Sequence, residues 1–182
     1  MIHKKFLKPL VLASMAALAI SALGVVAAGD TEGTAEVTGG DLTMTAPLTH
    51  NFGTVVLDGT NQTITSGSLV LNVKDARGTG AGWHINIAAT TFSDGVVDGE
   101  TLATDALKVT EASSVAVTGT NAVNNVPYAL TVPVTAVKLF NAAVDTGMGE
   151  INVTPTFTID IPATTQAATY TSTITTTVAT GP

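Results

Sequence analysis

The run Ile151-Asn152-Val153-Thr154-Pro155-Thr156-Phe157-Thr158-Ile159-Asp160-Ile161 alternates between two kinds of side chain. Every odd position is apolar and every even position is polar. A β-strand points successive side chains to opposite faces, so this pattern buries one face of the segment and leaves the other in water. The run therefore predicts a long strand in an antiparallel sheet.

Four further segments repeat this alternation. Their inward positions are Leu69, Leu71 and Val73; Trp83, Ile85 and Ile87; Tyr128, Leu130, Val132 and Val134; and Tyr170, Ile174 and Val178. Gly, Asn and Asp clusters typical of turns separate them, and a total of 33 threonines favours strands over helices. We predict an all-β fold, a Greek-key-like β-sandwich of antiparallel strands. A short helix over Thr101–Lys108 is the one helical alternative, and Pro133 predicts an edge strand or a bulge.

The first 28 residues have the pattern of an export signal. Lys4, Lys5 and Lys8 precede an uncharged apolar stretch that ends in the small residues Val26-Ala27-Ala28. We predict a signal peptide over residues 1–28 that is cleaved after Ala28; a retained membrane anchor is the alternative. A flexible segment over residues 29–41 and one sandwich domain over residues 42–182 would follow, with no membrane attachment after cleavage.

Charge and cysteine content narrow the classes of partner. The whole chain has a net charge of −7, from 7 Lys and Arg and 14 Asp and Glu. Three of the basic residues and none of the acidic ones lie in residues 1–28, so residues 29–182 carry a net charge of −10. Such a charge argues against nucleic acid and anionic lipid as partners. The chain has no cysteine, so an exported domain must be stabilised by its core instead of disulfides.

No motif in the sequence predicts catalysis. The glycine-rich run over residues 78–82 precedes a strand instead of a helix, so it lacks the helix N-terminus of a phosphate-binding loop and is interpreted as a tight turn. His50 and His84 stand apart from any Gly-x-Ser-x-Gly motif. An enzyme therefore ranks last among the function classes.

Acidic residues gather at predicted turns, and carboxylates at turns are ligands that Ca²⁺ accepts. Their spacing fits no EF-hand loop, so solvated turn carboxylates are the main interpretation and calcium the alternative, with no other cofactor or metal expected. The calcium candidates are Asp94, Asp98, Glu100 and Asp105.

The segment Asp75-Ala76-Arg77-Gly78-Thr79-Gly80-Ala81-Gly82-Trp83-His84-Ile85 resembles the first signature of the WxL domain family. Residues 142–149 and 159–178 are similar to the family's glycine-rich turn and C-terminal region, so the resemblance extends over about residues 42–182. This family consists of exported proteins of Gram-positive bacteria, many of which attach non-covalently to the cell wall. The chain departs from the family pattern at Ile85, where the family has Leu, and at Thr176 and Val178, which replace a second Trp-x-Leu signature.

The resemblance implies a wall-binding region around Trp83 and the C-terminal strand. Arg77 would pair there with a carboxylate of the wall. By periodicity Trp83 points inward and packs in the core, and direct contact with a ligand is the alternative. The wall-binding candidates are Asp75, Arg77, Gly82, Trp83, Ile85, Tyr170, Thr176 and Val178.

Two functions from different classes follow from these observations. The first is a secreted, non-enzymatic surface protein that adheres to peptidoglycan or another cell-wall polymer. The second is a structural subunit of an extracellular fibre or surface layer, in which the stretch 29–40 adds as a strand to the open sheet edge of another copy or of another surface protein.

Overall fold

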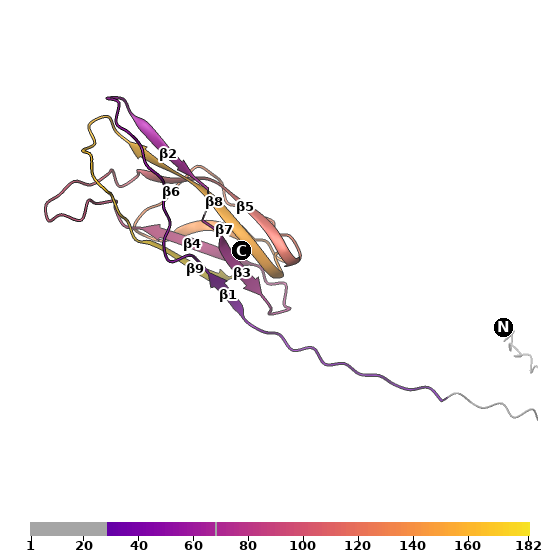
Figure 1. Ribbon diagram of the computed structural model, residues 1–182. Coiled ribbons are helices and arrows are strands. Elements are labelled where there is room, and N and C mark those ends of the chain that lie inside the picture. Colours follow the sequence, from indigo (N-terminus) through magenta and orange to yellow (C-terminus); the bar gives the residue numbers. More distant parts are fainter. Residues whose placement is uncertain (1–28, 68) are drawn as a thin grey trace, which may run out of the picture. The chain divides into compact units, whose positions relative to one another are not determined.

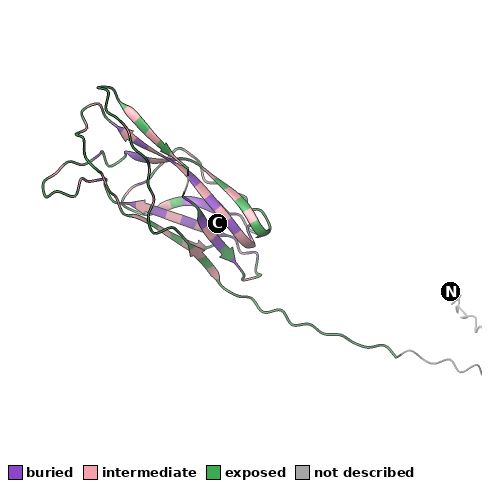
Figure 2. Ribbon diagram, viewed as in Figure 1, coloured by how far each residue is buried: buried purple, intermediate pink, exposed green. Residues whose placement is uncertain are grey.

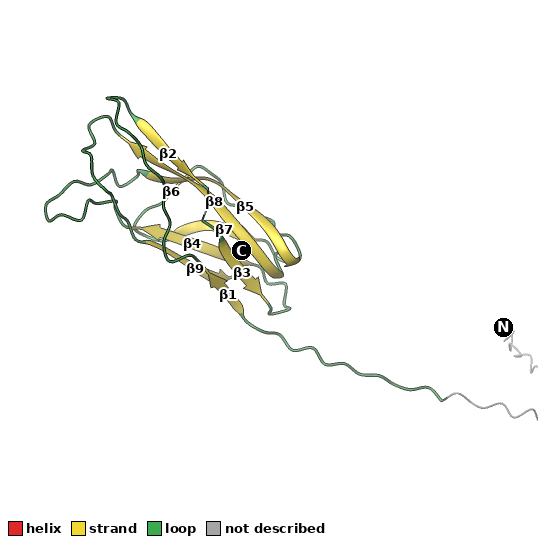
Figure 3. Ribbon diagram, viewed as in Figure 1, coloured by secondary structure: helices red, strands yellow, loops and turns green. Residues whose placement is uncertain are grey.

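The computed structural model describes residues 29–67 and 69–182 and contains strands but no helix within them (Figure 3). Residues 37–182 form one compact unit, and residues 29–36 are exposed and belong to no strand. The predicted signal peptide lies outside the described residues, so its cleavage and the boundaries at residues 28 and 41 stay predictions. Within the described part, no helix is long and apolar enough to cross a membrane.

Within residues 29–67 and 69–182, nine strands build two antiparallel sheets (Figure 1). The larger sheet has six strands and the smaller has three. This arrangement confirms the predicted all-β sandwich. The larger sheet contains β1 (Leu42–Thr45), β2 (Gln62–Ser66), β3 (Leu71–Asp75), β5 (Leu107–Gly119), β6 (Leu130–Thr131) and β8 (Gly149–Ile161), and the smaller contains β4 (Trp83–Ala89), β7 (Val137–Ala142) and β9 (Ile174–Thr180).

The predicted long strand, β8, is the centre of the larger sheet. It pairs with β5 along one edge, and along the other it pairs with β3 near its start and with β2 near its end. From Ile151 onward its odd residues are buried and its even residues half-buried, as the alternation predicts. The register places Val153 opposite Leu71 and Ile159 opposite Ile64, so apolar partners meet on the inner face.

The smaller sheet covers that inner face in the order β7-β4-β9. Its central strand alternates in the same way, with Trp83, Ile85 and Ile87 fully buried. The two inner faces enclose a continuous apolar core that also includes Phe140 and Phe157. Figure 2 shows buried residues recurring along the strands of both sheets. Burying each such side chain stabilises the fold by roughly 1.5–3 kcal/mol, so a core of this kind can hold the domain together without disulfides.

Two sequence expectations are adjusted by the structure. The alternative helix over Thr101–Lys108 is absent: Leu107 and Lys108 start β5, and the carbonyl of Leu107 accepts from Val132, so these backbone groups belong to the sheet. The strand expected over residues 128–134 shortens to the two residues of β6, because Pro133 cannot donate to a ladder. β6 is an edge strand, as Pro133 predicts.

Candidate functional site

The signature segment begins with a buried ion pair. Asp75, which ends β3, is only 3% exposed. The Nε and Nη2 groups of Arg77 donate to its two carboxylate oxygens, each at 2.8 Å, and the backbone N–H of Arg77 donates to Oδ1 at 3.1 Å. These hydrogen bonds from Arg77 lower the pKa of Asp75, against a smaller opposing effect of burial.

Arg77 also connects three parts of the chain. Its Nη2 donates to the carbonyl of Gly82 and its Nη1 to the hydroxyl of Thr180, both at 2.8 Å. Four of the five guanidinium N–H groups thus have partners within the chain. Arg77 thus pairs with Asp75 of its own chain and not with the wall carboxylate predicted from the sequence.

Trp83 lies at the other side of this turn and is fully buried. Its indole Nε1 donates to the carbonyl of Gly147 at 2.9 Å, and its ring packs against Phe140 with centroids 5.8 Å apart. The inward orientation predicted from periodicity is confirmed. Because Trp83 and Ile85 are both 0% exposed, neither side chain offers surface to a polymer in the folded domain.

Gly82 is enclosed by the neighbouring turn. Its φ of +68° is a left-handed conformation, and a Cβ at this position would lie 2.6 Å from the carbonyl oxygen of Ala142. Gly78, in the same loop, has a φ of +67° but nothing within 4 Å of such a Cβ. The two glycines therefore share the backbone conformation and differ in packing.

This difference yields a matched pair of variants. Gly78→Ala should lower the free energy of unfolding by about 1 kcal/mol, the strain of a left-handed alanine. Gly82→Ala should lower it by about 2 kcal/mol more, because the backbone of Ala142 must move away. Urea unfolding of both variants measures the difference, and equal destabilisation would show that residue 82 is not tightly packed.

The C-terminal strand β9 closes the same end of the sandwich. Val178 pairs with Ile85 and Thr176 with Ile87, and both β9 residues are half-buried on the inward side. Past the strand, the carbonyl of Gly181 accepts from His84 Nδ1 at 2.6 Å, and its N–H donates to Gly82. The positions of the missing Trp-x-Leu signature thus serve as inward strand positions, and the chain end is held on the signature loop.

The calcium candidates are dispersed over one loop. Asp94 uses its two oxygens to accept the backbone N–H groups of Val96 and Glu100, which lowers its pKa. Glu100 itself accepts from the amide of Gln166, while Asp98 and Asp105 are exposed. Within the described residues, no three His, Cys, Asp or Glu side chains come together to hold a metal. Calcium binding stays a prediction.

Tyr170 lies apart from the other candidates, in an open groove. The groove is a cavity of about 910 Å³ between two irregular segments, 50–57 and 165–172. Its floor is apolar, and its lining contains no Lys, Arg, Asp or Glu. The apolar floor is formed by Phe52, Ile64, Phe92, Leu102, Ile159 and Ile161.

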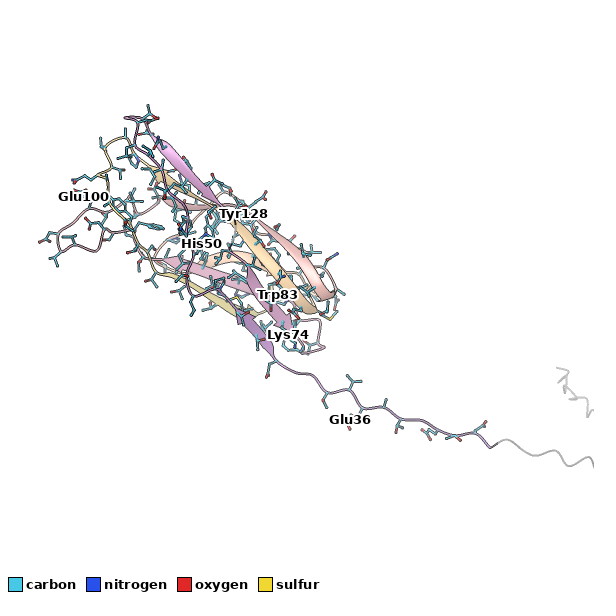
Figure 4. The ribbon with its side chains drawn as sticks, viewed as in Figure 1. Glu36, His50, Lys74, Trp83, Glu100 and Tyr128 are labelled. Atoms are coloured by element: carbon cyan, nitrogen blue, oxygen red, sulfur yellow. The ribbon has the colours of Figure 1, made fainter. Side chains whose placement is uncertain are left out.

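The groove lies toward the end of the sandwich opposite the signature. Strand β4 connects the two, because Trp83 is its first residue and Phe92, three residues beyond its end, reaches the groove. Gln166 on the groove rim donates a hydrogen bond to Glu100, so Glu100 marks the groove end of the domain. Figure 4 shows Glu100 and Trp83 toward opposite ends of the domain.

The groove rim carries uncharged polar groups. His50 Nε2 shares a hydrogen bond of 3.0 Å with the Ser66 hydroxyl, and its ring stands edge-on to Phe52 with centroids 4.6 Å apart. Burial lowers the pKa of His50, so its ring is neutral at pH 7. The Tyr170 hydroxyl donates to the carbonyl of Gln166 at 3.0 Å.

This rim does not form a catalytic triad. Among the described residues, the only side-chain partner of the His50 ring nitrogens is Ser66, and no carboxylate orients the imidazole. Sequence reasoning found Tyr170 but missed the rest of the groove, because its two walls follow neither the strand nor the helix period.

The sandwich thus has a buried signature at one end and, at the other, an open groove of the kind in which ligands bind. The chain belongs to the WxL domain family: the family model, described as a WxL domain for surface cell wall binding, matches residues 25–182. Neither the curated proteins nor the solved structures gave a significant match. The domain is thus of a cell-surface type that binds the cell wall.

Proposed function

We propose that this chain is a secreted, non-enzymatic surface protein that holds the cell wall non-covalently, with peptidoglycan as the polymer. The observation that carries the proposal is the family match, which spans residues 25–182 and thus the whole sandwich. Secretion is supported by the export-signal pattern of the first 28 residues.

The groove is the proposed contact with the polymer. The signature residues Asp75, Trp83 and Ile85 are buried, and Arg77 is committed to partners within the chain. The groove, by contrast, is open and large enough for a short stretch of glycan. Its apolar floor suits the C–H faces and acetamide methyl groups of sugars, and the hydroxyl and amide groups on its rim can bind sugar hydroxyls.

Charge also favours this location. The chain without its leader carries −10, so most of its surface repels anionic wall polymers. No Lys, Arg, Asp or Glu side chain lines the groove, so a neutral sugar segment can enter it without that repulsion. Bridging divalent cations would reduce the repulsion elsewhere on the surface.

Cosedimentation tests the function. The chain without residues 1–28 keeps the whole compact unit. We expect it to pellet with purified peptidoglycan, and more of it to pellet when millimolar Mg²⁺ or Ca²⁺ screens the negative charge. Failure to pellet both with and without divalent cation would contradict wall binding.

A pair of charge substitutions tests the location. Ala168 is an exposed groove residue, and Val144 is exposed near the signature end. Ala168→Glu should weaken peptidoglycan binding about tenfold, or ~1.4 kcal/mol, because it puts an unpaired charge where neutral sugar is bound. Val144→Glu changes the net charge equally and should leave binding near that of the unaltered chain. Weakened binding of Val144→Glu together with normal binding of Ala168→Glu would place the contact at the signature end. Thermal melting checks that both variants stay folded.

A further inference from the structure

Strand β5 has a long edge without a neighbour. It is 13 residues long and pairs with β8 over nearly its whole length. On its other side only Lys108 and Val109 pair, with the short strand β6. From Thr110 to Thr118, this side makes no backbone hydrogen bond to any described residue. At 3.4 Å per residue the open edge is about 30 Å long.

This edge carries few of the features that prevent strands from pairing. Between Thr110 and Thr118 the sequence has no Pro and no Lys, and Glu111 is its one charged residue. Val115 and Val117 are 66% and 52% exposed, an unusual exposure for β-branched apolar side chains. Bulges between Val109 and Glu111 and between Ala116 and Thr118 bound a regular stretch between them.

The other outer strands are less open. The edge strand β9 lies against β1, and β7 presents Lys138. β1, β2 and β6 are only four, five and two residues long. Among the outer strands of the described domain, β5 is therefore the one with a long, regular and nearly uncharged free edge.

We propose that two copies of this chain pair through this edge, with the β5 strands antiparallel about a two-fold axis at Ser114. A strand that pairs with its own copy around a two-fold axis places one residue opposite itself. With Ser114 at that position, Ser113 of one copy faces Val115 of the other, and Ala112 faces Ala116. No two like charges are opposed, and the two exposed Val115 side chains come to neighbouring positions on one face.

The paired edges join the two larger sheets into one continuous sheet. Because the axis closes the contact, the product is a dimer and not a fibre. It differs from the assembly expected from the sequence, in which residues 29–40 add to a neighbouring sheet. A dimer would present two grooves to the wall. Once one groove has bound the polymer, the other is held close to it, which raises the effective concentration for the second binding event.

Sedimentation velocity of the chain without residues 1–28 tests the dimer. We expect the weight-average mass to rise toward twice the monomer mass as the concentration increases from about 5 to about 500 µM. The double variant Ser113→Lys/Val115→Lys should stay monomeric, because it brings like charges together across the axis. Val144→Lys is the control outside the edge and should dimerise normally. Monomers at all concentrations would overturn the proposal, and dimers lost on removal of residues 29–36 would assign the contact to the N-terminal segment instead.

Cysteine substitution tests the register. The chain has no cysteine, so a single introduced thiol reports only the contact between two copies. Residues opposite each other on adjacent strands have Cβ atoms about 4.5–5.5 Å apart, close to disulfide range. Under mild oxidation Ser114→Cys should cross-link, while Val97→Cys, which is exposed in a distant loop, should not. Cross-linking of Ser113→Cys or Val115→Cys in place of Ser114→Cys would overturn the register, and cross-linking of none would count against edge pairing.

Discussion

Replacing Trp83 by alanine is expected to lower the free energy of unfolding by about 4 kcal/mol, the range for deleting a fully buried Trp. The change empties the space between Phe140 and the Gly147 turn. It also leaves the carbonyl of Gly147, a buried residue, without its indole donor.

Chemical denaturation measures this loss, and Trp83→Phe separates its two causes. Phenylalanine keeps most of the ring volume but cannot donate to Gly147, so we expect a cost of about 1–3 kcal/mol. If both variants were as stable as the unaltered chain, Trp83 would not be the buried centre of this end of the domain.

The same variants separate folding from wall binding. Because Trp83 is 0% exposed, Trp83→Ala molecules that remain folded should bind peptidoglycan as well as the unaltered chain does. Binding measured well below the melting temperature checks this. A folded variant that has lost wall binding would show that the signature acts at the contact and not through stability.

The strands that could be predicted from sequence are those with a clean period of two. Strands β3, β4 and β8 place apolar side chains at alternate positions, and β9 does so at Ile174 and Val178 with Thr176 between them. The structure buries or half-buries those positions. Strand β5 could not be found this way. Its central inward residues are Ala and Ser, and two bulges shift its alternation, while its first residues continue a stretch with helical spacing.

Three further strands lack the signal for other physical reasons. β1 and β2 are only four and five residues long, and β2 turns the polar side chains of Gln62 and Ser66 inward. β7 ends in four consecutive buried residues, from Leu139 to Ala142, because the 120–129 region covers the side that would otherwise face water. Such positions follow from tertiary packing and leave no periodic pattern in the sequence.

The candidate site, too, could be predicted from the sequence only in part. The signature residues could be recognised as a local segment, but their function in the fold depends on distant partners. Arg77 reaches Thr180, 103 positions later, and Trp83 reaches Gly147, 64 positions later. The groove requires two irregular segments more than a hundred positions apart, so only the aromatic residue Tyr170 could be singled out beforehand.

Arg77→Ala is expected to lower the free energy of unfolding by about 4 kcal/mol at pH 7, because it leaves the buried carboxylate of Asp75 without its partner. Arg77→Lys retains the positive charge but loses the two-pronged contact and the reach to Thr180. Arg77→Lys should therefore lower the free energy of unfolding, but by less than Arg77→Ala does.

The pH dependence of this cost identifies its electrostatic origin. In the folded chain the pKa of Asp75 is lowered from 3.8, so the pair stabilises the fold fully above pH 3.8 and loses this effect as the pH falls through the lowered value. Without Arg77, burial alone raises the pKa of Asp75, so the folded variant takes up its proton at a higher pH than the unfolded chain. The variant therefore regains stability as the pH falls toward 3.8, while the unaltered chain gains nothing from this pair.

The difference in unfolding free energy between the variant and the unaltered chain should be largest near neutral pH and shrink on acidification. Urea midpoints at a series of pH values would measure it. A difference that did not change with pH would mean that Arg77 stabilises the turn by packing and its bonds to Gly82 and Thr180, with the charge of Asp75 contributing little.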